Sequence, residues 1–133
     1  MRWIPFPASE GDAESGSEVV STVLVQGLVV LVILLLAQIA FASHVRTMSV
    51  SAASEGARRG GLLGGDEGEA IARTSELLDT LVGASKDREI AVDRHSDEGV
   101  DVLVVTVRTR LPLVGGLGPR WMTVRGRALV EGP

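Results

Sequence analysis

The sequence feature that most constrains the fold is an uncharged, apolar run from Val23 to Ala42. None of its twenty residues is Asp, Glu, Lys or Arg, and its only polar side chains are Gln26 and Gln38. A helix rises about 1.5 Å per residue, so a helix of this length matches the roughly 30 Å hydrocarbon core of a bilayer. The run therefore predicts a single membrane-spanning helix with lipid around it.

Two amides, Gln26 and Gln38, interrupt the apolar surface of this helix, and Gly27 lies beside the first. An amide side chain costs less in lipid than a charge because it can hydrogen-bond to a neighbouring helix, and a glycine lets two helix backbones approach closely. We therefore expect Gln26, Gly27 and Gln38 to be the positions where the helix packs against partner helices.

Residues 1–18 have the composition of a disordered acidic leader, since prolines, serines and carboxylates cannot form a core. The sequence Ala40-Phe41-Ala42 has the pattern of a signal-peptidase site at the end of the apolar run. However, twenty apolar residues exceed the usual core of about 7–15 residues in a signal peptide, and the leader lacks a strongly basic start. We favour a retained anchor over a removed signal peptide.

Neither Pro nor a loop-forming cluster stops the helix between residues 43 and 59. The sequence predicts one helix over residues 19–59, whose second part leaves the membrane as a stalk. Small residues recur along this part, and two interpretations of them stay open: they let another helix approach closely, or they keep a solvated helix soluble. These residues are Ser49, Ala52, Ala53, Gly56 and Ala57.

Residues 60–133 predict a small soluble α+β domain. Gly60-Gly61 ends the long helix, and Asp66 with Glu69 three residues later has the spacing of a helix N-cap. Apolar residues at helical spacing then predict a short amphipathic helix over Glu67 to Val82.

The hydrophobic period changes to two after this helix. Three strands are predicted, with a turn at Ser96 to Gly99 and a Gly-rich connection at Pro112 to Pro119. The strands are Glu89 to Asp93, Val100 to Leu111 and Trp121 to Val130. The expected fold is thus a long membrane and stalk helix, then a short helix covering the apolar face of a three-stranded antiparallel sheet.

The residues that carry most enzyme chemistry are scarce. The chain has no Cys, and its two histidines, His44 and His95, lie on different predicted elements without acidic partners at ligand spacing. A formal net charge of −4 and no basic cluster larger than Arg58-Arg59 argue against a nucleic-acid partner. We expect a non-enzymatic protein without a metal or cofactor.

Two short motifs flank the apolar run in a characteristic order. Gly16-Ser17-Glu18-Val19-Val20 precedes it, and Ala52-Ala53-Ser54 followed by Glu55-Gly56-Ala57-Arg58 comes after it. Together with the strand at Val102 to Pro112 and Val124-Arg125-Gly126-Arg127-Ala128, this order resembles the TadE-like family of tight-adherence pilus pseudopilins, in its actinobacterial form. The resemblance covers Gly16 to Val130, and its most specific part is the conjunction of Gly-Ser, apolar run and Glu-Gly-Ala-Arg.

The resemblance implies a pilin-like subunit that a prepilin peptidase cuts at the cytoplasmic face, after a glycine. By that pattern the cut falls between Gly16 and Ser17, which places Ser21 where such proteins usually carry Glu at the fifth position. A cut after Ala13 would instead begin the mature chain at Glu14 and place Glu18 at the fifth position. In that register, however, Ala13 stands before the cut where the family has Gly. Glu18 is also explained as a carboxylate favoured near a helix N-terminus.

The family also implies a location and partners. Its members have the C-terminal domain outside the plasma membrane and act with other pilus subunits and an assembly platform. The positive-inside rule favours the opposite orientation here, since Arg46, Arg58 and Arg59 follow the apolar run. We follow the family, because a C-terminal part of this length can be translocated despite its charges. The alternative function is a membrane-anchored scaffold or interaction protein unrelated to pili.

Overall fold

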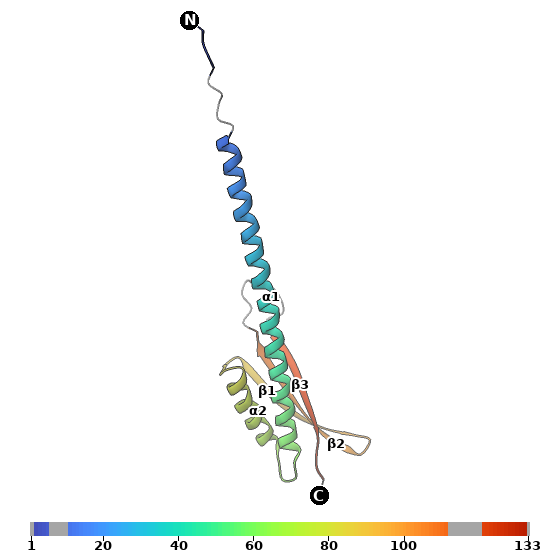
Figure 1. The fold of residues 1–133 in the computed structure, drawn as a ribbon. Coiled ribbons are helices and arrows are strands. Elements are labelled where there is room, and N and C mark those ends of the chain that lie inside the picture. Colours follow the sequence, from blue (N-terminus) through green and yellow to red (C-terminus); the bar gives the residue numbers. More distant parts are fainter. Residues whose placement is uncertain (1, 6–10, 112–120, 133) are drawn as a thin grey trace. The chain divides into compact units, whose positions relative to one another are not determined.

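A computed structural model describes residues 2–5, 11–111 and 121–132 of the chain (Figure 1). Its elements in order are α1 (Gly11–Gly61), α2 (Glu67–Leu81), β1 (Arg88–Asp97), β2 (Val100–Arg110) and β3 (Trp121–Leu129). The predicted α+β class is confirmed: a long N-terminal helix, a short helix and a three-stranded antiparallel sheet.

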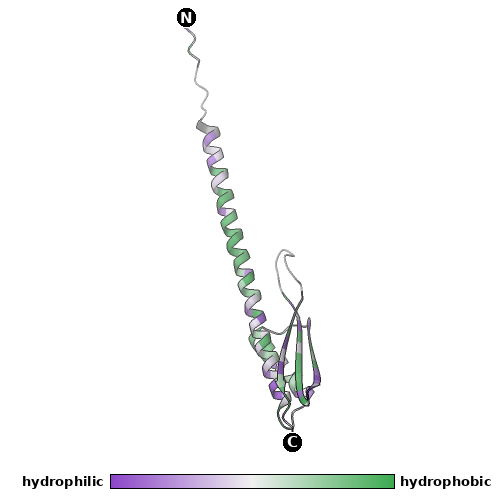
Figure 2. Ribbon diagram, turned by 90° about the vertical axis from the view of Figure 1, so that its right-hand side faces the viewer, coloured by the Kyte–Doolittle hydropathy of each residue, from purple (hydrophilic) through white to green (hydrophobic). Residues whose placement is uncertain are grey.

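The chain divides into two compact units, Met1–Ala37 and Gln38–Pro133. In the first unit, α1 carries most of the apolar run, which is the continuous hydrophobic stretch in Figure 2 and ends within the second unit. Its large apolar side chains are exposed except that of Leu35, which is half-buried, and none of the most apolar stretch is buried inside the protein. Within the described part of the chain, α1 is the one helix long and apolar enough to cross a membrane.

The helix begins earlier than the sequence predicted. We expected disorder through residue 18, but α1 starts at Gly11. Glu14 lies in its first turns, where a carboxylate interacts favourably with the helix dipole. Once the apolar run has nucleated the helix, each further residue adds one backbone hydrogen bond. This gain offsets the low helix propensity of Gly16. Composition alone therefore placed the end of the leader too late.

Helix α2 has the predicted start. The Asp66 Oδ1 accepts a hydrogen bond from the Glu69 N–H at 2.7 Å, which confirms the N-cap. The helix ends at Leu81, one residue before the predicted end, and Gly83 follows with φ +102°. Its buried face consists of Ala70, Thr74 and Leu78.

The sheet has the order β1-β2-β3, and both pairs are antiparallel. Strand β1 is longer than the predicted Glu89 to Asp93, because only Glu98 and Gly99 form the turn to β2. Both have positive φ, 50° and 84°, the backbone of a tight two-residue hairpin that keeps pairing up to Asp97. Strands β2 and β3 each end one residue before their predicted ends. The predicted Gly-rich connection Pro112 to Pro119 lies outside the described residues.

The apolar face of the sheet forms the core of the second unit. Alternation along β2 and β3 is confirmed, since Leu103, Val105, Val107, Met122 and Val124 are all buried. We expected α2 to be the cover for this face, but α1 covers it too. Side chains at helical spacing along one stripe of α1 are buried there: Val45, Ser49, Ala52, Ala53 and Ala57. Of the two interpretations of the small residues, the structure supports close helix packing, and the partners lie within this chain.

Candidate functional site

The residues of both predicted cleavage registers lie in the first turns of α1. They are Gly16, Ser17 and Ser21 for one register, and Ala13, Glu14 and Glu18 for the other. A Cβ added at Gly16 would meet no heavy atom within 4 Å, so no side chain packs over this position. Both bonds proposed for cleavage lie within the helix, and Gly16 and Ser17 are exposed, so cutting either bond requires the end of α1 to unwind locally.

The predicted helix-packing residues fall in both units. Gln26 and Gly27 belong to the first unit and are exposed, and a Cβ at Gly27 would meet nothing within 4 Å. Gln38 is half-buried at the start of the second unit. Gln26 and Gly27 thus have room for a partner helix on a surface that the chain itself leaves uncovered.

The motif Glu55-Gly56-Ala57-Arg58 alternates between the core and solvent. Gly56 and Ala57 are buried, whereas Glu55 and Arg58 are exposed. A Cβ at Gly56 would overlap the Thr74 Oγ1 and lie 2.9 Å from the Ala70 carbonyl oxygen, so α1 and α2 cross at this glycine. The motif therefore has a packing role inside the second unit.

A second close approach joins α1 to the sheet. Gly126 of β3 is buried, and a Cβ there would overlap the Ala53 carbonyl carbon and the Ser54 nitrogen. Because both contacts are to backbone atoms, no side-chain rearrangement would relieve the overlap. Gly56 and Gly126 thus fix the positions of α2 and β3 against the same stretch of α1.

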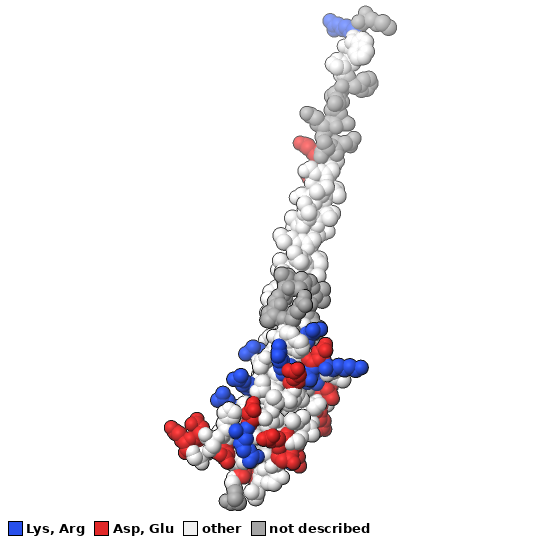
Figure 3. Space-filling model, turned by 180° about the vertical axis from the view of Figure 1, so that it is seen from behind, with Lys and Arg blue, Asp and Glu red and all other residues white. Residues whose placement is uncertain are grey.

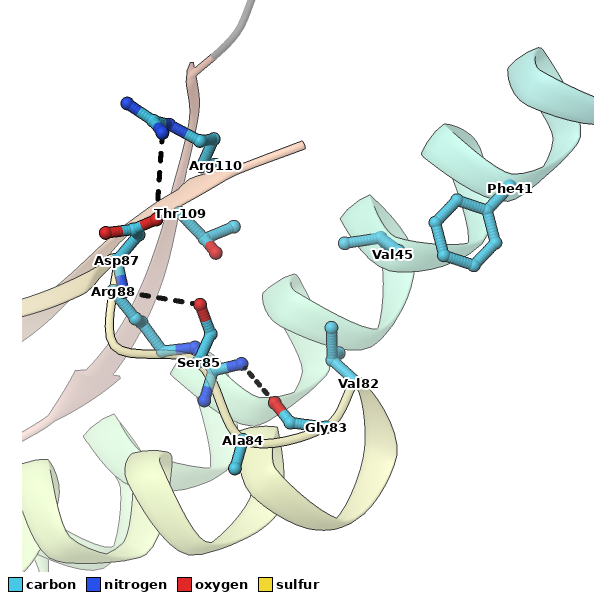
Figure 4. A pocket seen from close by; sticks show the side chains of 10 residues that line it. All are labelled: Phe41, Val45, Val82, Gly83, Ala84, Ser85, Asp87, Arg88, Thr109 and Arg110. Carbon is cyan, nitrogen blue, oxygen red and sulfur yellow. Dashed lines mark hydrogen bonds and ion pairs between the residues drawn. The ribbon is translucent and has the colours of Figure 1, made fainter. Parts of the chain in front are cut away.

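A hollow of about 240 Å³ lies beside the end of the apolar run. Phe41 and Val45 approach it from α1, while Arg88 and Arg110 come from the strands (Figure 4). The Arg88 side chain is 5% exposed; it donates to the Asp79 Oδ1 at 2.8 Å and to the Gly83 carbonyl oxygen at 2.7 Å. This arginine therefore ties β1 to the C-terminal end of α2, where a cation is favoured by the helix dipole.

A tryptophan between two arginines marks one end of the outer sheet face. The guanidinium carbons of Arg108 and Arg110 lie 4.8 and 5.1 Å from the centre of the Trp121 ring. These distances fit cation–π contacts, and Trp121 stays 38% exposed. Arg110 also forms a 3.8 Å ion pair with Asp87, whose partners are both exposed.

Sequence reasoning missed the roles of Gly126, Arg88 and Trp121. A glycine within a β-branched strand is a signal of close backbone approach, but it does not say which backbone approaches. The Trp121 contacts depend on the register Arg110↔Trp121, which the sequence of the connection does not specify. Arg88 immediately precedes the predicted strand, and nothing local indicates that its side chain is buried.

The described residues hold no group of three or more His, Cys, Asp or Glu side chains that could bind a metal ion. Comparisons of the chain with protein-family models, with curated proteins and with solved structures found no match. The function is therefore argued from the residues and their geometry.

Proposed function

We propose that this protein is a TadE-like pseudopilin, a non-enzymatic, single-pass membrane component of a Tad-type pilus assembly or secretion system. The observation that carries the proposal is α1 itself. One helix holds an uncovered apolar surface in its first part and a small-residue stripe in its second, and that stripe supports a folded α+β unit. A chain built this way is suited to presenting a small domain at a membrane surface.

The order of the motifs supports the proposal further. Gly16-Ser17 precedes the apolar run, and Glu55-Gly56-Ala57-Arg58 follows it at the site where α2 crosses α1. In this proposal the first motif meets a prepilin peptidase, and the second builds the domain. The exposed apolar surface with Gln26 and Gly27 then meets lipid and the helices of other pilus subunits.

The proposed orientation places the C-terminal domain outside the plasma membrane. Arg46, Arg58 and Arg59 would oppose this by the positive-inside rule. Ala57, which immediately precedes the last two, is buried in the packed unit, so Arg58 and Arg59 belong to a folded domain rather than to a short loop. The rule has least weight for long translocated segments.

Deleting the gene and imaging surface pili tests the pilus role. We expect fewer pili and weaker adhesion, both restored by the wild-type gene. Unchanged pili would contradict the proposal. Crosslinking in native membranes identifies the partners: recovery of pilin, platform or assembly-ATPase subunits is expected, and recovery of unrelated proteins alone would favour a membrane-anchored scaffold.

N-terminal sequencing of the protein from native membranes tests the processing. A chain that begins at Ser17 supports the glycine register, and one that begins at Glu14 supports the alanine register. An intact amino terminus would contradict processing and leave an unprocessed anchor.

A further inference from the structure

The two ends of the second unit differ in charge. Seen from behind, Lys and Arg side chains predominate toward one end of this unit and Asp and Glu toward the other (Figure 3). We name one set of residues in this unit the basic rim: Trp121 with Arg46, Lys86, Arg108 and Arg110. Two carboxylates lie beside these cations in a chain whose formal net charge is −4: Asp87 pairs with Arg110, and Glu89 is opposite Arg108 in the sheet.

The basic rim lies where the apolar run ends. Arg110 and Phe41 line the same hollow, together with Val45, which immediately precedes Arg46. Lys86 lies in the loop between α2 and β1, and its two neighbours in sequence, Ser85 and Asp87, also line that hollow. The run ends at Ala42, so about one helical turn separates its last residue from Arg46. Phe41 belongs to the second unit, so if the end of the run is seated in hydrocarbon, the rim residues that line the hollow with Phe41 lie close to the lipid headgroups.

The composition of the rim suits that depth. An indole ring is favoured at the membrane interface because it has an apolar body and a polar N–H, and Trp121 remains partly exposed between its two arginines. Arginine and lysine attract anionic headgroups, and this attraction acts within a Debye length of about 8 Å at physiological salt. The only ion pair that neutralises a rim cation in the described residues is the exposed 3.8 Å pair between Arg110 and Asp87.

We propose that the basic rim rests on the membrane surface and binds the headgroups of anionic phospholipids. The inference rests on the proposed membrane anchoring of α1. Continuity with the apolar run favours lipid over a soluble acidic partner, because the anchor would hold the rim against the bilayer permanently. The rim would then set how the domain stands on the membrane and which face it offers to other subunits.

The test uses the full chain carrying Trp3→Phe, which leaves Trp121 as the only tryptophan. The protein is reconstituted into vesicles of phosphatidylcholine alone and of phosphatidylcholine mixed with phosphatidylglycerol. Both contain a lipid with a spin label on its headgroup, which quenches nearby indoles. We expect stronger quenching and a blue shift of Trp121 emission in the phosphatidylglycerol vesicles. The difference should be lost at about 1 M salt, where the Debye length is about 3 Å.

Matched variants separate the rim from overall charge. Arg108→Gln with Arg110→Gln should abolish the phosphatidylglycerol dependence. Arg94→Gln with Arg127→Gln removes the same charge from exposed positions of β1 and β3 away from the rim, and should preserve it.

Vesicle flotation makes the outcomes distinguishable. A chain that floats with both vesicles but shows equal quenching in both would overturn the rim proposal and leave the anchor standing. A chain that floats with neither would overturn the anchor and the rim together. Shielding of Trp121 that grows with the protein-to-lipid ratio, and not with phosphatidylglycerol, would overturn the lipid proposal in favour of a second copy as the partner.

Discussion

Gly126 of β3 lies directly against the backbone of Ala53 in α1. This contact joins the helix that carries the apolar run to an edge strand of the sheet that lies far from it in the sequence. It makes the second part of α1 an internal element of the folded unit.

Replacing Gly126 with Ala should destabilise the second unit by about 1–3 kcal/mol, the usual cost of overpacking. The added Cβ meets backbone atoms of Ala53 and Ser54, which cannot move without shifting α1. The measurement is urea denaturation in detergent micelles, followed by Trp121 fluorescence in the Trp3→Phe background. Gly132→Ala is the control, since a Cβ there meets nothing within 4 Å. Equal stability of the two variants would show that β3 does not touch α1.

Substitutions in the motif Glu55-Gly56-Ala57-Arg58 should have different effects on stability at its buried and its exposed positions. Gly56→Ala forces Thr74 and Ala70 away and should cost about 1–3 kcal/mol in the same assay. Glu55→Gln and Arg58→Gln change exposed side chains and should stay within about 0.5 kcal/mol of wild type. Adding Thr74→Ala to Gly56→Ala should recover part of the loss, because it removes the overlapping hydroxyl. A neutral Gly56→Ala would contradict the close crossing of α1 and α2.

Ser49 should tolerate the loss of its hydroxyl. The Ser49 Oγ is fully buried and has no hydrogen-bond partner among the described residues. A buried polar atom without a partner costs about 1–3 kcal/mol, so Ser49→Ala should be neutral or stabilising. Ser51→Ala, at an exposed position of the same helix, provides the comparison. Clear destabilisation by Ser49→Ala alone would indicate that the hydroxyl is hydrogen-bonded after all.

The amides of the apolar run should affect assembly and leave the fold unchanged. Replacing Gln26 and Gln38 with Leu removes the side chains able to hydrogen-bond across helices in lipid. If the proposed function holds, the Gln variant co-purifies fewer pilus subunits, while the urea midpoint of the second unit is unchanged. Val25→Leu with Ile39→Leu alters adjacent positions without removing an amide and should retain the partners. Unaffected recovery in the Gln variant would exclude these amides as contacts.

Local chemistry in the sequence was enough to predict the elements of the second unit. The alternation of β2 and β3 and the Asp66 N-cap depend on neighbours in sequence, and both are found in the structure. The start of α1 was predicted too late, because an acidic, glycine-containing composition was interpreted as disorder although nothing in residues 11–18 breaks a helix.

Contacts between residues far apart in the sequence could not be predicted from the sequence pattern. The small residues of α1 fit either packing or solvation until a partner surface is known, and the sheet supplied that surface. The cluster of Trp121 with Arg108 and Arg110 likewise requires the β2–β3 register, and a one-residue shift would have placed these side chains on opposite faces. The sequence therefore predicted the apolar helix as an anchor, whereas the packed face of α1 and the Trp121 cluster were found only in the tertiary structure.

The most direct test of the central claim is the accessibility of single cysteines in intact cells. The chain has no native Cys, so Val19→Cys before the apolar run and Glu98→Cys in the β1–β2 turn each give one labelling site. With a membrane-impermeant maleimide, the account predicts that Glu98→Cys is labelled in intact cells and Val19→Cys only after lysis. Labelling of both sites only after lysis, or of Val19→Cys alone in intact cells, would contradict an anchor that presents the folded unit outside the membrane.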